Sequence, residues 1–302
     1  MTAPSPACRE DVRRTLAYLT AVGYGGTAME VWQWLYRPSR AWSLEEVMVA
    51  LDAQVAEAKV DVMQGRYALA GHGARMADRH ERYLSSDKKM QSARWFLRVM
   101  RLIPGVRAVA VCNSLSHEMA SEKSDIDLFV ITRSRALWCV RFFALLPLSL
   151  LRRRPGHRTR HPICLSFFLS DASLDLRDVH LKPDDPHMAH WLLSTVPMID
   201  DGVFADCIHA NAWARELFPN AQSPRVAWYR RLACLRPLSW SLPFWLERVL
   251  EQFQLERLPS EIRTRMNGST DVIINEHMLK FHTNDRRLEY RERFLSLARV
   301  QK

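Results

Sequence analysis

Residues 106–131 read VRAVAVCNSLSHEMASEKSDIDLFVI, and this stretch decides the fold that the sequence predicts. The apolar run Val106–Cys112 is typical of a buried strand, and two small polar residues, 113 and 114, end it. A short helical turn is expected next, followed by a second strand over residues 126–132. The stretch therefore predicts two neighbouring strands joined by a polar turn.

Two acidic residues stand where the second strand begins. Residues two apart on a strand project to the same face, so Asp125 and Asp127 present two carboxylates side by side. Two like charges that close repel each other unless a cation joins them. Mg²⁺ is the natural partner, because it takes carboxylate oxygens together with substrate phosphates. The sequence therefore predicts a magnesium site on Asp125 and Asp127.

The whole pattern is Cys112-Asn113-Ser114, ten intervening residues, then Asp125-Ile-Asp127-Leu. It resembles the signature of the nucleotidyltransferase superfamily, with a domain like that of polymerase beta. The resemblance implies a small mixed-sheet core in which Asp125 and Asp127 hold the metal and carry catalysis. It also implies that Asn113, Ser114 and Ser124 bind the nucleotide.

The activity implied by this resemblance is Mg²⁺-dependent transfer of a nucleotidyl group from an NTP, with ATP as the expected donor, to an unidentified acceptor. Two departures from the family pattern support an alternative. The usual Gly is Asn113 here, and no third carboxylate lies on the next expected strand, His161–Ser170. Asp171 and Asp175 lie just beyond that strand and are candidates for the missing acid. The alternative is a protein that keeps the fold and binds a nucleotide or nucleic acid with reduced catalysis.

The first 75 residues form a separate unit. Helical spacing predicts two short helices, a capping box at Ser43 and Glu46 opens a third, and residues 60–69 read as a hairpin around Gln64-Gly65. This order resembles a winged helix, which suggests a DNA-binding regulator as a second alternative. The third helix, however, is acidic, whereas a helix that faces phosphates should be basic.

The remaining chain completes an α/β (α+β) organisation. Residues 1–75 form the winged-helix-like unit, and residues 76–100 a charged linker helix that we expect to be solvated. Residues 101–180 form the nucleotidyltransferase core, and residues 181–302 a mainly helical region. Within the core, the apolar run Leu137–Leu151 has two interpretations. It is a helix buried against the sheet, or an interfacial segment lying on anionic lipid.

Composition constrains partners and compartment. The chain has 302 residues, with 43 Lys and Arg against 33 Asp and Glu, which gives a net charge of +10. This balance favours anionic partners such as nucleotides, nucleic acid or a lipid surface. The tract Arg152–Arg160 adds five arginines, either for phosphate contacts or for solubility.

The apolar run is too short for a stable membrane span, and the N-terminus lacks the apolar core of a signal peptide. We therefore expect the chain to be cytoplasmic. The six cysteines are expected to be reduced thiols. The spacing of His180, His187 and His190 argues against zinc, because the His-Glu-x-x-His pattern is absent.

Overall fold

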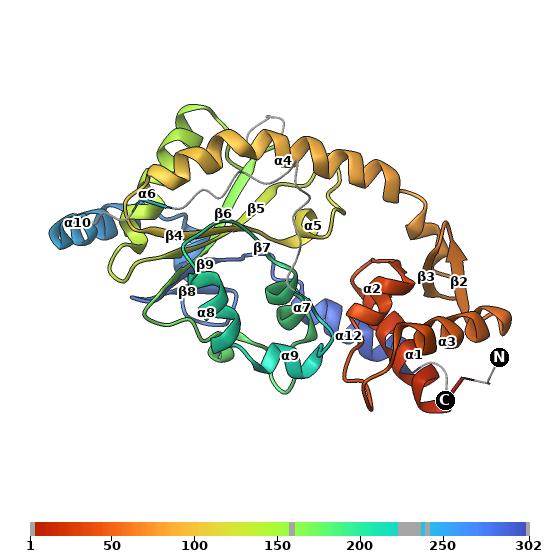
Figure 1. Cartoon of the computed structure of the whole chain (residues 1–302). Coiled ribbons are helices and arrows are strands. Elements are labelled where there is room, and N and C mark those ends of the chain that lie inside the picture. The colour runs from red at the N-terminus through yellow and green to blue at the C-terminus, as the bar shows by residue number, and fades with distance from the viewer. Residues whose placement is uncertain (1–3, 157–160, 223–236, 239–241, 300–302) are drawn as a thin grey trace.

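The computed structural model describes residues 4–156, 161–222, 237–238 and 242–299. Its strands form two sheets, one of three strands in the order β1-β3-β2 and one of six in the order β7-β4-β5-β6-β9-β8. Helices pack around both (Figure 1). The mixed α and β class that the sequence predicts is confirmed.

The N-terminal unit has the three helices and the hairpin in the order that the sequence predicts, and it adds a two-residue strand and a 3₁₀ turn that were not predicted. Its elements are α1 (Pro6–Ala21), β1 (Gly26–Thr27), α2 (Ala28–Gln33), α3 (Leu44–Ala56), β2 (Val60–Met63), β3 (Arg66–Leu69) and a 3₁₀ turn at Gly73–Met76. The capping box of α3 is present, because Glu46 N donates to Ser43 Oγ and Ser43 N donates to a carboxylate oxygen of Glu46. Between β2 and β3, Gln64 and Gly65 have φ of 52° and 72°. These left-handed residues form the tight hairpin turn.

The predicted linker is α4 (Arg79–Leu102), and it is not solvated on all sides. One stripe of the helix, which includes Ala93, Phe96, Leu97 and Met100, is buried against the large sheet. The prediction of a solvated linker was wrong because the charged residues scattered along the helix, of which Lys89 is itself buried, hide the apolar spacing. Figure 1 shows α4 running across the top of the sheet from the N-terminal unit.

The six-stranded sheet contains the three predicted strands and three more. Its members are β4 (Val106–Val111), β5 (Ile126–Thr132), β6 (Ile163–Ser170), β7 (Val196–Asp200), β8 (Val272–Ile274) and β9 (Met278–Phe281). Strands β4 and β5 pair antiparallel, as expected for neighbours in sequence. Strands β5 and β6 pair parallel, and α6 (Leu137–Leu150) makes the crossover between them.

Three strands come from the region expected to be mainly helical, so the sheet does not end at residue 180. Strand β7 follows directly after α7 (Pro186–Ser194), in a run whose apolar spacing suggested one continuous helix. Strands β8 and β9 have three and four residues, too few for an alternating pattern to be visible in the sequence.

Helices cover both faces of the large sheet. Side chains such as Val109 and Val130 pack against α4, α6 and α10 (Phe244–Leu255). The alternate residues, such as Ala110 and Ile131, pack on the other side against α7 and α8 (Val203–Ala210). The other helical elements are α5 (Asn113–Ser116), a 3₁₀ turn at Arg177–Val179, α9 (Trp213–Leu217), α11 (Ser260–Arg265) and α12 (Arg287–Arg299).

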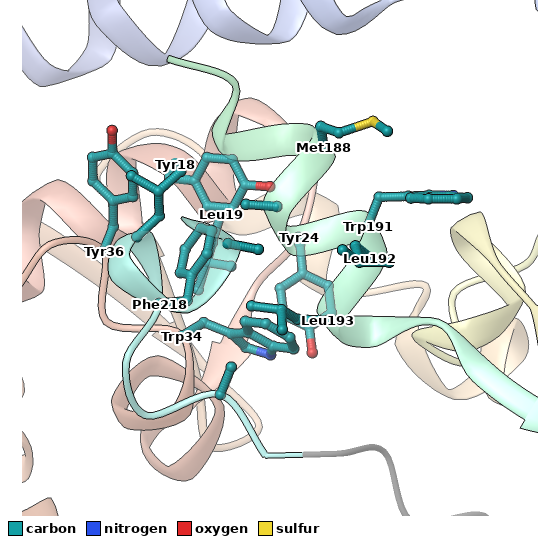
Figure 2. Packing of buried hydrophobic residues seen from close by; sticks show 14 of the residues in the cluster. Tyr18, Leu19, Tyr24, Trp34, Tyr36, Met188, Trp191, Leu192, Leu193 and Phe218 are labelled. Atoms are coloured by element: carbon teal, nitrogen blue, oxygen red, sulfur yellow. The ribbon is translucent and has the colours of Figure 1, made fainter. Parts of the chain in front are cut away.

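The N-terminal unit shares one core with the second face of the sheet. Figure 2 shows Tyr18, Trp34 and Tyr36 of this unit meeting Phe218 and the residues of α7. The ring centroids of Trp34 and Phe218 are 5.8 Å apart, and those of Tyr18 and Phe294 on α12 are 5.8 Å apart. The unit is therefore packed firmly onto the rest of the chain, and not tethered through α4 alone.

Candidate functional site

A cavity of about 660 Å³ lies beside the N-terminal ends of β5 and β6. Helix α7, the segment after β9 and the N-terminal unit line the rest of it. Its lining includes four of the five predicted site residues: Asn113, Ser114, Asp125 and Asp127. The predicted signature is therefore gathered on one wall of one concave site. The volume falls within the range usual for small-molecule sites.

The two carboxylates are held at the start of β5. Burial raises the pKa of Asp127 above its ordinary value, and the nearby charge of Asp125 adds to this effect. Hydrogen bonds from Asn113 and Cys164 to Asp127 act in the opposite direction without cancelling the increase. Burial also raises the pKa of Asp125, against the charge of Lys89. The described protein groups therefore leave the negative charge of this pair incompletely compensated.

The turn after β4 places Asn113 beside the carboxylates. Asn113 has a φ of 57°, in the left-handed region that Asn tolerates better than most side chains. Asn113 thus adopts a conformation that Gly would also allow at this turn. Its side chain hydrogen-bonds Asp127 and thereby ties the turn to the acidic pair.

Ser124 is the one predicted site residue that does not line the cavity. Its hydroxyl donates to the carbonyl oxygen of Ser121, and its own carbonyl accepts from Lys89 Nζ at 2.7 Å. Lys89 is fully buried on α4 and donates to Glu122 O as well, at 3.1 Å. Its ammonium group fixes the loop that leads into Asp125, a role that sequence analysis missed because the lysine looked like part of a solvated helix.

Neither candidate for a third carboxylate reaches the cavity. Strands β5 and β6 run parallel from Asp127 opposite Cys164 to Thr132 opposite Ser170, so Asp171 lies at the far end of the sheet. There it accepts from Arg107 Nη1 at 3.1 Å. Asp175 is exposed and accepts from the Arg177 backbone. The idea that either acid reaches round to the site was wrong, because a rise of about 3.3 Å per residue carries them away from it.

A serine and a histidine occupy the position beside the acids. Ser166 Oγ on β6 and His282 Nε2 after β9 are 2.8 Å apart, and both residues line the cavity. Burial, with the charge of Lys280, lowers the pKa of His282 to about 4. The imidazole is therefore neutral near pH 7 and has one nitrogen with a free lone pair. Sequence analysis missed His282 because it lies 116 residues from its partner.

The segment after β9 adds a balanced ionic cluster to the cavity wall. Lys280 Nζ lies 3.1 Å from an oxygen of Asp285, and Arg287 pairs with Asp285 and with Asp185. Burial lowers the pKa of Lys280 to about 8. Burial alone would raise the pKa of Asp285, but the hydrogen bond and charges from Arg287 and Lys280 hold it well below its ordinary range. This cluster orders the segment that carries His282.

Histidine rings line the side of the cavity that the N-terminal unit closes. The rings of His117 and His190 stack with centroids 4.6 Å apart, and the His187 ring stacks on Tyr290 at 4.8 Å. Burial lowers the pKa of His117 and of His187 to about 4. Tyr24 from the N-terminal unit lines the same region. The unit thus helps to shape the cavity.

The donor set suits Mg²⁺ better than zinc. Within the described residues, no group of three or more His, Cys, Asp or Glu side chains is placed to hold a metal ion. Two carboxylates on a cavity wall are nevertheless enough for Mg²⁺, which completes its shell with waters and substrate phosphates. Burial raises the pKa of the neighbouring Cys164 thiol to about 12, so this sulfur stays protonated and is a poor ligand.

The described arginines of the predicted tract, Arg152–Arg154, do not line the cavity. Arg152 and Arg154 are exposed, and Arg153 Nη2 donates to Ser92 Oγ on α4 at 2.6 Å. Arg158 and Arg160 lie outside the described residues.

No helix in the described ranges combines the length and apolar character needed to cross a bilayer. The five described cysteines have free thiols, and Cys234 is outside the described part.

Comparison of the chain with protein-family models, with curated proteins and with solved structures found no match.

Proposed function

We propose that the protein is a Mg²⁺-dependent nucleotidyltransferase that takes its nucleotidyl group from an NTP, with ATP as the expected donor. One observation carries the proposal. Asp125 and Asp127, whose negative charge the surrounding groups leave incompletely compensated, share a cavity of about 660 Å³ with the turn at Asn113 and Ser114. The signature that resembles the nucleotidyltransferase superfamily supplies these same residues.

The residues have separate roles in this proposal. Asp125 and Asp127 hold the metal, which when bound neutralises negative charge on the phosphates. Asn113 keeps Asp127 in place through its side-chain hydrogen bond. Ser114 contacts the phosphates from the same wall. Lys89 anchors the preceding loop through Ser124 O, so that Asp125 is held before the nucleotide arrives.

His282 is the proposed proton acceptor for the acceptor's hydroxyl, whose oxygen attacks the α-phosphorus while the bond to the leaving pyrophosphate breaks. It occupies, with Ser166, the place where the family resemblance led us to look for a third carboxylate. A neutral imidazole can accept a proton, but the low pKa of His282 makes it a weak base before a nucleotide binds. The negative charge of a bound triphosphate would raise this pKa and strengthen the base.

Two labelled forms of ATP test the proposal. Purified protein is incubated with Mg²⁺, a cell extract, and ATP labelled on either the α- or the γ-phosphate. Nucleotidyl transfer predicts a product that carries only the α label, whereas a phosphoryl transfer would move the γ label. Asp127→Asn should abolish the product, and Asp175→Asn is the matched control because its exposed carboxylate lies outside the cavity. Equal labelling by wild type and Asp127→Asn would contradict the proposal.

A second candidate is nucleotide binding without turnover. The observation that favours it is the absence of an acidic residue on the cavity-facing part of β6, where Cys164 and Ser166 stand. Calorimetry separates the two candidates. Saturable Mg·ATP binding together with no α-labelled product from any extract supports the binding protein, and a labelled product supports the enzyme.

A further inference from the structure

A continuous apolar strip runs over two helices on the face of the sheet opposite the cavity. On α10 it consists of residues four apart, and on α6 the same spacing continues it. Its members are Trp245, Val249, Phe253, Phe142, Leu146 and Leu150. The side chains of Trp245 and Leu150, near the two ends of the strip, are 65% and 75% exposed. Spacing of four residues places each set on one side of its helix.

The two halves of the strip meet at an aromatic contact. The rings of Phe142 and Phe253 pack edge to face with centroids 5.9 Å apart. The opposite side of α10 is fixed to α6, because buried Glu247 accepts from Trp138 N and Cys139 N, each at 2.8 Å. The side of α10 that packs against the protein is therefore already in place, and the apolar stripe lies on its other, outward side. It is a second apolar face that the described chain leaves uncovered.

Arginines border this strip. The Arg257 guanidinium lies 3.8 Å from the Phe253 ring centroid, and that of Arg135 lies 5.2 Å from the ring of Phe244, the residue before Trp245. Exposed Arg152 and Arg154 follow the α6 end of the strip. Of the acids nearby, Glu251 pairs with Arg248 on α10, and Glu256 pairs with Arg257 just after the helix. The border therefore has an excess of positive charge.

We propose that this strip docks the protein on an anionic lipid bilayer. Trp and Phe side chains bordered by Arg suit the boundary between acyl chains and headgroups, and each basic residue near an anionic surface adds to the attraction. A second copy of this chain is a poorer occupant, because self-association would bring two positively charged borders together in a protein of net charge +10.

Docking through the strip leaves the cavity open. Helices α6 and α10 cover one face of the large sheet, whereas α7 and the N-terminal unit enclose the cavity on the other (Figure 1). The membrane-docked protein can therefore still admit a nucleotide. The proposal does not depend on the chemistry at Asp125 and Asp127.

Vesicle flotation tests the proposal with the full chain. Wild type should float with phosphatidylcholine vesicles that contain phosphatidylglycerol, and not with phosphatidylcholine alone, and high salt should release it. Leu150→Glu and Trp245→Glu should each weaken binding about tenfold or more, because each places a charge where an apolar side chain enters the bilayer. Met48→Glu on α3 is the matched control, since Met48 is 47% exposed on the remote N-terminal unit.

The possible results distinguish an anionic bilayer from a second copy of the chain as the binding partner of the strip. Binding by wild type and Met48→Glu that is lost in both strip variants supports the proposal. Failure of the wild type to float with anionic vesicles overturns it, as does equal binding by all four proteins. A wild-type dimer that Leu150→Glu converts to a monomer, without any flotation, would assign the strip to a second copy. Circular dichroism of each variant confirms that a loss of binding is not a loss of fold.

Discussion

Replacement of His117 by glutamine should remove part of the protein's sensitivity to acid. The imidazole stacks on His190 and its Nε2 lies 3.1 Å from Ser194 Oγ. Burial, followed by the charges of His187 and Arg79, lowers the pKa of His117 to about 4. Gln has a similar reach and can accept a hydrogen bond from Ser194, but it does not titrate.

The sign and size of the effect follow from linkage. The unfolded chain has a His117 pKa of about 6.5, so as the pH falls it takes up a proton before the folded protein does. The contribution of neutral His117 to the free energy of unfolding is therefore fully present above about pH 6.5 and is lost as the pH falls toward about 4. With a folded-state pKa of about 4, His117 lowers the free energy of unfolding at about pH 5 by about 2 kcal/mol relative to neutral pH.

Urea unfolding at several pH values measures this contribution. Between about pH 7.5 and pH 5, the free energy of unfolding should fall by about 2 kcal/mol more for wild type than for His117→Gln. His277→Gln is the control, because the His277 side chain is 44% exposed. It should follow the wild type. Parallel curves for wild type and His117→Gln would refute the assignment of His117 as a buried neutral histidine.

Three further substitutions test other parts of the structure. Glu247→Ala should lower the free energy of unfolding by about 3 kcal/mol, because it leaves two buried backbone N–H groups of α6 without an acceptor; a loss near zero in urea unfolding would contradict this cap. Gly65→Ala should cost about 1 kcal/mol through its φ of 72° alone, since no atom lies within 4 Å of the added methyl, and a neutral result would contradict the turn geometry. His282→Gln should slow nucleotidyl transfer by about 100-fold while Mg·ATP affinity changes little. Unchanged transfer would exclude His282 as the base.

The sequence predicted features that depend on neighbours along the chain. The α3 cap needs only Ser43 and Glu46, and the hairpin needs only Gln64-Gly65 between short strands. Strands β4 and β5 are consecutive in the chain, joined by the segment that contains α5. The carboxylate pair follows from strand alternation alone. Each of these was predictable because its contacts are local or between adjacent strands.

The parts that were missed depend on long-range packing. Strand β9 pairs with β6, and only this pairing brings His282 to Ser166. Lys89 became recognisable as a buried anchor only when α4 was seen on the sheet. Of the two interpretations of residues 137–151, the helix buried against the sheet is confirmed, since α6 buries Val140 and Ala144 against the core; contact of its exposed end at Leu150 with lipid stays a prediction. Spacing within one segment contains no information on which other segments will cover it.

Calorimetric titration of ATP, with Mg²⁺ and then with EDTA, tests whether Asp125 and Asp127 form a Mg²⁺-dependent nucleotide site. The titrations compare the wild type with Asp127→Asn and with the control Asp175→Asn. We expect saturable binding by the wild type and by Asp175→Asn only when Mg²⁺ is present. Asp127→Asn should bind about 100-fold or more weakly, because the metal loses one of its two carboxylate ligands. Binding that is equally strong in EDTA, or equally strong in Asp127→Asn, would rule out the proposed site.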